Sequence, residues 1–210
     1  MYKSMVRKRK KGLETTRRIL DTAADLFAHK GFDGVSVREL AEKAGIRESS
    51  VYNHFKSKSD ILEALFNEFI KEVPLSRPSD SELDKLLLIM GPEEVFKNIL
   101  FHVGEHVCGT LANIAMIIYD EQLKSERAAR MYYRYMVREP ADYYERLINK
   151  MIERKMVKPV DARIFAEQYN YVSLMLTREY FMAQNGLADV DSVVKYMIST
   201  LKFFCKLMEK

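Results

Sequence analysis

The sequence predicts an all-α protein of about nine or ten helices, and three observations lead to this prediction. The chain of 210 residues contains only 8 Gly and 5 Pro, so residues that interrupt regular structure are scarce. Few segments alternate between apolar and polar side chains, as half-buried strands do. Apolar residues recur instead every three or four positions, which is the repeat of one face of an amphipathic helix.

The N-terminal part of the chain begins with two predicted helices. Residues 14–30 carry apolar side chains at helical spacing, and Gly31 ends this helix. Ser36 with Glu39 three residues later forms a capping box, in which each side chain can satisfy an unpaired backbone N–H. We therefore expect a second helix over residues 36–43.

A third short helix is predicted over residues 47–54, after a tight turn that contains Gly45. Together the three segments make a helix-turn-helix pattern. Val51 and Phe55 lie one turn apart and would hold the third helix on the first two. Its other residues are Arg, Ser, Tyr and Asn, which can bond base edges and phosphates in a major groove. The alternative is a small solvated helix with no partner.

Charge is distributed unevenly along the chain. Residues 1–60 hold 14 Lys and Arg against 8 Asp and Glu, whereas residues 61–210 hold 20 against 22. Within residues 1–11 there are six basic residues and no acidic one: Lys3, Arg7, Lys8, Arg9, Lys10 and Lys11. A basic N-terminal arm on a near-neutral chain indicates a polyanionic partner, and a solvated, disordered tail is the alternative.

The helix-turn-helix residues resemble those of TetR-type transcriptional regulators over about residues 14–65. The motifs that match in register are Gly31-Phe32, Ser36-Val37-Arg38-Glu39-Leu40-Ala41, Ala44-Gly45-Ile46 and Val51-Tyr52-Asn53-His54-Phe55-Lys56-Ser57-Lys58. The resemblance implies a homodimer that binds a double-stranded DNA operator with two-fold symmetry. It also implies that a small-molecule effector in the C-terminal domain releases the DNA, so that the protein acts as a repressor.

Carried over by position, the resemblance implies three kinds of DNA contact. Ser36 would bond a phosphate at the start of the second helix. Bases would be faced by Arg47, Ser49, Ser50 and Asn53, and backbone phosphates would be held by Tyr52, His54 and Lys58. The chain departs from the family at Arg47, where many members have Ser or Thr, and at the acidic Glu48. Arg47 can reach a guanine, and we expect Glu48 to complement the helix dipole rather than accept from a cytosine.

The rest of the chain is predicted to be one helical domain. We expect an N-terminal arm over residues 1–12, a DNA-binding domain over 13–58 and an effector-binding and dimerisation domain over 59–210. Ser57 and Asp60 start the connecting helix, which ends before Pro74. Further helices are predicted over residues 79–90, from Pro92, near 110–123, 126–138, 140–156 and 161–185, and at the end of the chain.

The last two helices are predicted to form a dimer interface. Apolar residues of the final helix step by four and three from Val190 to Met208, like the seam of a coiled coil, and the preceding helix is apolar nearly all round. A two-fold four-helix contact would bury both, and a monomeric core is the alternative. The predicted interface residues are Tyr171, Met175, Met182, Val194, Met197, Leu201 and Phe204.

Many of the 12 Met, 12 Tyr and 11 Phe lie in the C-terminal domain. Met adapts to irregular shapes and Tyr adds a polar group to an apolar body, as a pocket for a hydrophobic or aromatic effector requires. Such residues also build ordinary cores. The predicted pocket residues are Phe96, Leu100, Val103, Met116, Tyr119, Tyr144, Tyr171 and Met175.

Other kinds of site find little support in the sequence. His102 and His106 are four apart on one predicted helix, but no second ligand cluster accompanies them, so we predict no metal site. No phosphate-binding loop, nucleophile motif or cofactor motif is found, so we expect neither an enzyme nor a cofactor. The longest uncharged run, residues 107–119, is too short to span a membrane. Without a signal peptide and with two Cys, we expect a cytoplasmic protein.

Two other functions remain open at this point. The C-terminal domain could bind a protein, so that the chain is a DNA-bound adaptor. It could also be a small-molecule enzyme with an accessory DNA-binding head.

Overall fold

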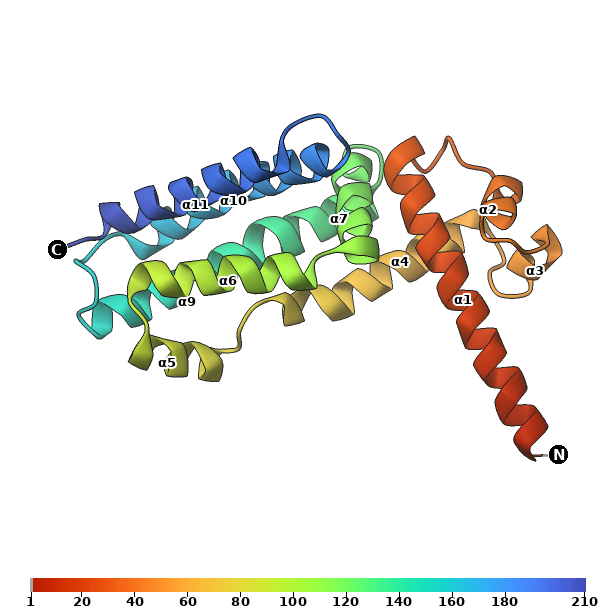
Figure 1. The fold of residues 1–210 in the computed structure, drawn as a ribbon, viewed down its shortest axis with the longest axis horizontal. Helices are drawn as coiled ribbons and strands as arrows, with labels where there is room; N and C mark the ends of the chain where they lie inside the picture. The colour runs from red at the N-terminus through yellow and green to blue at the C-terminus, as the bar shows by residue number, and fades with distance from the viewer. Residues whose placement is uncertain (1) are drawn as a thin grey trace. The chain divides into compact units, whose positions relative to one another are not determined.

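The computed structural model describes the backbone of residues 2–210 and the side chains of residue 10 and residues 12–210 (Figure 1). The predicted all-α class is confirmed, since the secondary structure within these residues is helical throughout. The chain divides into two compact units. We call residues 1–72 with 108–128 the head, and residues 73–107 with 129–210 the body.

The head is built on a long first helix. Its helices are α1 (Tyr2–Lys30), α2 (Val37–Lys43), α3 (Glu48–Tyr52), α4 (Lys58–Glu72) and α7 (Gly109–Glu121). Helix α1 packs against α2, α4 and α7, and α3 packs on α2 (Figure 1). Apolar side chains from each of the longer helices are fully buried, so the head has a continuous core.

Local signals in the sequence set the helix ends of the head. The Ser36 hydroxyl accepts a hydrogen bond of 3.1 Å from the backbone N–H of Glu39, which confirms this half of the predicted capping box, and the Glu39 carboxylate pairs with Lys30. Gly31 and Gly45 end α1 and α2 with φ of 75° and 64°, a region that other residues rarely adopt. The second and third predicted helices are confirmed, each shorter by one to three residues at its ends.

The first helix begins much earlier than residue 14, where apolar periodicity starts. It runs from Tyr2, because residues 2–13 are rich in Lys and Arg, which favour helix even without an apolar face. Except for Lys10, which is exposed, the side chains of the basic arm lie outside the described residues.

Helix α4 belongs to the head by its packing. The Ser57 hydroxyl accepts from the N–H of Asp60 at 3.1 Å, as predicted, and the helix ends at Glu72 before the 3-10 turn η1 (Val73–Ser76). Ile61 and Leu65 have no exposed surface, because α4 packs on α1 and α7. The compact unit therefore extends beyond residue 58, where the sequence places the boundary of the DNA-binding domain.

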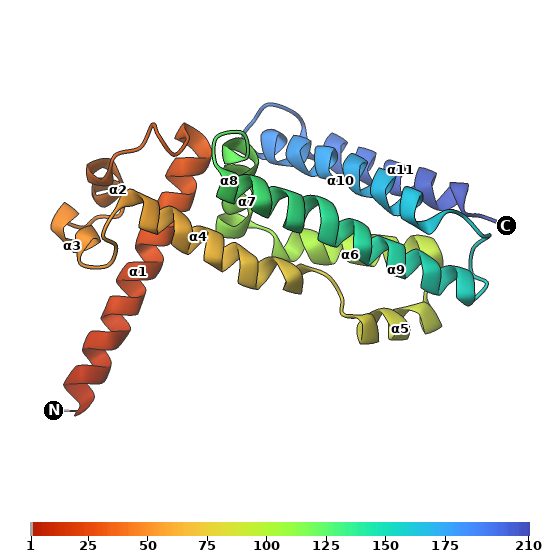
Figure 2. The ribbon, with the colours of Figure 1, turned by 180° about the vertical axis from the view of Figure 1, so that it is seen from behind.

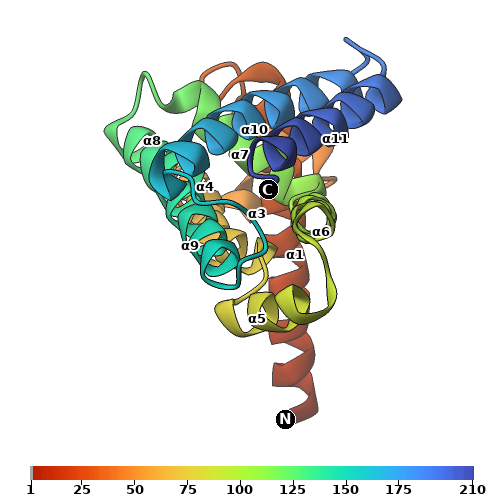
Figure 3. The same ribbon diagram turned by 90° about the vertical axis from the view of Figure 1, so that its left-hand side faces the viewer.

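The body is a bundle around a shared core. Its elements are η1, α5 (Asp80–Ile89), α6 (Pro92–His106), the end of α8 (Glu126–Met131), η2 (Tyr132–Arg138), α9 (Glu139–Glu153), α10 (Ala162–Gln184) and α11 (Val190–Leu207). Helix α10 packs on α9 and on α11, and α11 packs on α6. Figures 2 and 3 show α10 and α11 lying side by side along most of their length.

Segment η2 is a π-helical turn that joins α8 to α9 without a break. The side chain of Asn170, 5% exposed on α10, donates to the carbonyls of Met136 and Val137 at 3.1 and 3.2 Å. A π-turn shifts carbonyls out of the usual i→i+4 pattern, so a buried amide is a suitable partner for them. Periodicity predicts two separate helices here, over 126–138 and 140–156.

No single helix in the described chain is long and apolar enough to cross a membrane. Helices α6 and α7 meet the same length and composition criterion only as a bent pair.

Gly45 offers a direct test of the turn between α2 and α3. We expect Gly45→Ala to lower the free energy of unfolding by about 1–2 kcal/mol, because a Cβ is strained at positive φ although nothing would contact it. Gly12→Ala is the matched control, since Gly12 also has open space but lies inside α1. That change should stabilise the protein by roughly 0.5–1 kcal/mol. Urea unfolding measures both, and equal effects would contradict the argument.

Candidate nucleic-acid interface

Helix α3 is held on the head by one apolar side chain. Val51 is 1% exposed and is the residue of this five-residue helix that the described structure buries. The backbone N–H of Ile46 in the preceding turn donates to the carbonyl of Ala41 at 3.0 Å. After the helix, half-buried Phe55 donates its N–H to the carbonyl of Val51 at 2.9 Å. Val51 is therefore confirmed as a predicted anchor, and Phe55 lies half-buried just after the helix.

The rest of α3 forms a polar surface. Arg47, Glu48, Ser49 and Asn53 are exposed and Ser50 is half-buried. Tyr52 is 50% exposed. The structure thus brings together five of the eight residues predicted to contact DNA. Glu48 lies in the first turn of α3, where its charge favours the helix dipole.

Arg47 occupies the N-cap position of α3 in an extended conformation, with φ −76° and ψ 147°. Its side chain makes no capping hydrogen bond among the described residues. A Ser or Thr at this position would turn its hydroxyl back onto the helix. The Arg47 guanidinium is therefore not used for capping, and its five N–H donors remain available to a partner.

Ser36 lies at the start of α2 and is exposed. Its cap uses a lone pair of the hydroxyl, so the hydroxyl proton can still be donated to an outside acceptor. This geometry is compatible with the predicted phosphate contact.

His54 is tied to α1 by a hydrogen bond. Its Nδ1 lies 2.9 Å from the Thr16 hydroxyl, which also donates to the carbonyl of Gly12 at 3.1 Å. Nδ1 is thus occupied within the head, and Nε2 is the ring nitrogen left for the predicted phosphate contact.

Lys58 has an intramolecular role that the sequence does not reveal. Its Nζ donates to the carbonyls of Phe32 and Val35 at 2.7 and 2.8 Å and lies 4.3 Å from the centre of the Phe32 ring. These contacts fasten the loop before α2 to the start of α4. The ammonium group has three donors, so the predicted phosphate contact would use the third.

The residues predicted to line an effector pocket do not come together in one place. Phe96 and Tyr144 stack at 5.9 Å within the body core, and Leu100 and Val103 pack against that core. The remaining four are spread over different surfaces: Tyr171 and Met175 are exposed on α10, and Met116 and Tyr119 lie on α7 in the head. An apolar pocket formed by these eight residues therefore stays a prediction.

The predicted dimer interface needs correction at two positions. Leu201 and Phe204 are 1% and 9% exposed and belong to the body core, where Phe204 packs edge-on against Tyr169. The apolar seam of α11 thus faces its own protomer. The spacing of apolar residues along the helix shows that a seam exists, but it does not show whether the protomer or a partner covers it. Val194 and Met197 are half-buried. The other three predicted residues are exposed: Tyr171, Met175 and Met182.

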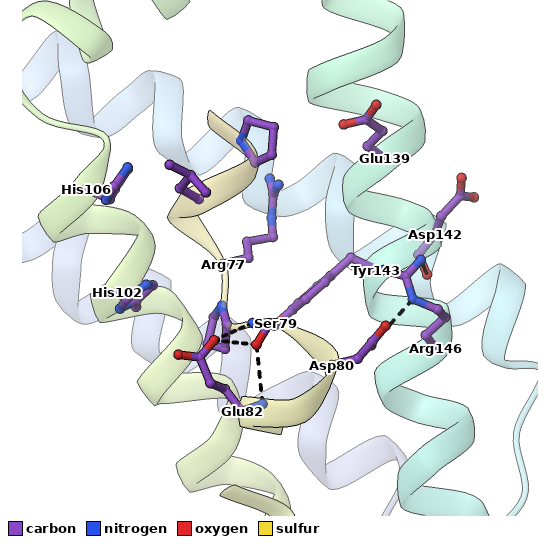
Figure 4. Close-up of a pocket in the computed structure, with 13 residues that line it drawn as sticks. Arg77, Ser79, Asp80, Glu82, His102, His106, Glu139, Asp142, Tyr143 and Arg146 are labelled. Atoms are coloured by element: carbon purple, nitrogen blue, oxygen red, sulfur yellow. Dashed lines mark hydrogen bonds and ion pairs between the residues drawn. The ribbon is translucent and has the colours of Figure 1, made fainter. Parts of the chain in front are cut away.

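A polar cavity of about 720 Å³ lies in the body between η1, α5, α6 and α9 (Figure 4). Its lining includes Arg77, Glu82, His102, Tyr143 and Arg146. The sequence itself does not group these residues into one site. These residues come from four separate segments, so no local motif could have identified them. His102 and His106 stack at 6.4 Å here, and the described residues hold no group of three ligands suited to a metal ion.

Comparison with known proteins agrees with the geometry of the head. Residues 19–65 match the family of bacterial regulatory proteins named the tetR family. The HTH-type transcriptional regulator AcrR of Shigella flexneri is 40% identical over 103 residues, which are 48% of this chain and 46% of AcrR. Residues 19–65 therefore carry the helix-turn-helix region of the tetR family of regulatory proteins.

Solved structures show that the same fold extends over the body. The TetR-family regulator PfmR of Thermus thermophilus superposes with a TM-score of 0.61 at 19% identity, covering 88% of this chain and 97% of PfmR. AibR in complex with isovaleryl coenzyme A and operator DNA gives 0.56 at 21% identity, covering 78% and 86%. These likenesses establish a shared fold. The chain matches about half or less of the length of the first curated relatives.

Lys58 and Lys56 form a matched pair that tests the intramolecular contacts. We expect Lys58→Ala to lower the free energy of unfolding in the absence of DNA by about 1–3 kcal/mol, because two carbonyls lose a charged donor. Lys56→Ala, which alters an exposed lysine two residues earlier, should change it by less than about 0.5 kcal/mol. Equal losses in chemical denaturation would show that Lys58 does not fasten the loop.

Proposed function

We propose that the protein is a transcriptional repressor that binds a two-fold operator as a homodimer and is released by a small molecule. The observation that carries this proposal is the exposed polar face of α3, which Val51 alone anchors on the head. A helix held in this way can enter a major groove and present its side chains to base edges. The match of residues 19–65 to the tetR family of regulatory proteins supports the same use of the helix.

In the proposed complex, side chains of α3 read bases, and its neighbours hold the DNA backbone. Arg47 and Asn53 have the planar donor groups that recognise guanine and adenine in pairs of hydrogen bonds. The shorter side chains of Ser49 and Ser50 add single hydrogen bonds to bases. Ser36, Tyr52, His54 and Lys58 hold phosphates, which fixes the register of the helix in the groove.

The exposed apolar surface of α10 and α11 supports the homodimer. We call it the dimer face, and its exposed members are Ile164, Tyr171, Met175 and Met182 on α10 with Tyr196, Phe203 and Leu207 on α11. The exposed fractions of Met175, Tyr196 and Phe203 are 57%, 60% and 59%. So many large apolar side chains on two adjacent helices mark an interaction surface, and a second copy related by a two-fold axis covers it with the same residues.

Small-molecule control is supported by a structural neighbour and by the cavity. AibR, which shares the fold, has been solved with both isovaleryl coenzyme A and operator DNA. The body of this chain contains a cavity of about 720 Å³, large enough for a small metabolite. A ligand that favours one conformation of the dimer would change the spacing of the two α3 helices, which must match half-sites about 34–36 Å apart.

Substitutions of residues proposed to contact bases and of residues proposed to contact phosphates should give different results in a binding selection on random DNA. Arg47→Ala or Asn53→Ala should relax the base preference at one position of each half-site, at a cost of about 1–3 kcal/mol. Tyr52→Phe removes a phosphate donor and should weaken binding about equally on all sequences. If Arg47→Ala left the preferred sequence unchanged, Arg47 would not read a base.

The dimer face predicts a change of oligomeric state on substitution. Met175→Glu places a charge on the dimer face and should convert the dimer to a monomer in sedimentation equilibrium at micromolar protein. Leu88→Glu is the matched control, because Leu88 is 79% exposed on α5 and lies outside the dimer face. A dimer that survives Met175→Glu and dissociates with Leu88→Glu would place the interface elsewhere.

A further inference from the structure

The polar cavity of the body contains two buried hydrogen-bond donors that the protein does not use. Nε of Arg77 and the hydroxyl of Tyr143 are buried and have no hydrogen-bond partner among the described residues. Tyr143 is only 7% exposed, and both residues line the cavity. Buried polar groups are nearly always bonded, so two unbonded donors beside one cavity are unusual.

Both groups act as donors under ordinary conditions. A guanidinium keeps its protons at any physiological pH. Burial raises the pKa of Tyr143 far above that of a free tyrosine, so its hydroxyl stays protonated. The ring of Tyr143 lies between two guanidinium groups, with those of Arg77 and Arg146 at 6.0 and 5.9 Å from its centre. The complement of two unbonded donors beside a cation is an oxygen acceptor with negative charge.

The carboxylates around the cavity already have partners. Asp80 lies 3.7 Å from Arg146, Asp142 binds Arg163 at 2.6 Å and Glu139 binds Arg134 at 2.8 Å. The fourth, Glu82, accepts from the backbone N–H of Ser79 at 2.7 Å in the capping box of α5. Arg77 differs from these arginines, because the described residues place no carboxylate within ion-pair distance of it. Arg77 is therefore the guanidinium of the cavity wall that no carboxylate of the described residues contacts directly.

Figure 4 shows how the other walls complete the cavity. His102 and His106 lie on α6 on one side, Tyr143 and Arg146 lie on α9 on the other, and Arg77 lies between them. The chain before α5 adds apolar surface from Pro74, Leu75 and Pro78. A ligand here would meet one cationic centre, several polar groups and an apolar patch.

We propose that this cavity binds a small organic carboxylate whose carboxylate group accepts from Nε of Arg77 and from the hydroxyl of Tyr143. The single unpaired guanidinium of Arg77 matches one negative charge, and four neighbouring carboxylates disfavour a doubly charged phosphate. The apolar patch receives the hydrocarbon or aromatic part of the molecule. That this ligand is the effector rests on the proposed function, whereas its binding does not.

Calorimetric titration of the full-length protein tests the proposal with three ring-matched probes. Benzoate should bind at millimolar or lower concentration and raise the melting temperature. Benzyl alcohol lacks the charge, and phenyl phosphate carries a second one, so both should bind at least several-fold more weakly. Equal binding of benzoate and benzyl alcohol, no binding of benzoate, or tighter binding of phenyl phosphate would each overturn the carboxylate assignment.

Two variants place the ligand within the cavity. Arg77→Gln should weaken benzoate binding roughly tenfold or more, because the charged donor is lost. Tyr143→Phe should raise the melting temperature of the free protein, since an unbonded buried hydroxyl is removed, and should weaken benzoate binding several-fold. A merely structural role for the hydroxyl would not produce these opposite effects. Unchanged benzoate affinity in Tyr143→Phe would overturn the proposal even if Arg77→Gln failed to fold.

Tyr169→Phe is the matched control, because Tyr169 is also buried in the body and does not line the cavity. Its benzoate affinity should equal that of the unaltered protein. Adding benzoate to the DNA complex then separates the two proposals. Benzoate binding without any DNA binding would leave the cavity assignment intact and refute the proposed function. DNA binding without benzoate binding would leave the proposed function intact and refute the cavity assignment.

Discussion

The docking of α3 through Val51 is the contact on which the proposed DNA-binding surface depends. A helix of five residues is far too short to be stable alone in water, so its position is set by what it buries. Within the described structure only Val51 of this helix is buried, and the turn at Gly45 fixes where the helix starts. One anchor leaves the remaining side chains on the surface. The same feature that makes α3 marginal as a structural element makes it available to a partner.

The neighbours of α3 show how the head supports such a small element. Lys58 uses its ammonium group to hold the loop between α1 and α2, and His54 bonds Thr16 on α1. Arg17 joins α1 to α4 through Glu68 at 2.6 Å, and Thr110 on α7 donates to Asp21 at 2.7 Å. Polar side chains thus link α1, α4 and α7 to one another and to the segments on either side of α2 and α3. A change in α7 or α4 can reach α1 through these bonds, which is the kind of connection that effector control requires.

Sequence alone predicted the local features of the head well. The Ser36 cap, the glycine stops and the Val51 anchor depend on residues within a few positions of each other, so their chemistry can be recognised directly. Lys58 shows the limit, because the carbonyls that it bonds belong to residues 23 and 26 positions earlier. The start of α1 was missed because basic residues can extend a helix without any apolar pattern.

The body was predicted only in outline, and the reason is physical. Periodicity shows that α11 has an apolar stripe, but it does not show whether the protomer or a partner covers the stripe. Leu201 faces inward, whereas Phe203, two residues later, is 59% exposed. The polar cavity combines residues from the segment after η1, from α5, from α6 and from α9, and its two unbonded donors become visible only after packing. Burial of Asn170 beside the π-turn is likewise a product of tertiary contact.

Hydrogen exchange on the full chain, with and without a mixed-sequence DNA duplex at low ionic strength, tests the central claim most directly. Such DNA binds through its phosphates and needs no knowledge of the operator. If α3 enters the groove and α2 holds the backbone, the amides of residues 36–39 and 47–53 will exchange more slowly in the complex. Slower exchange confined to other segments, with these amides unchanged, would contradict the account.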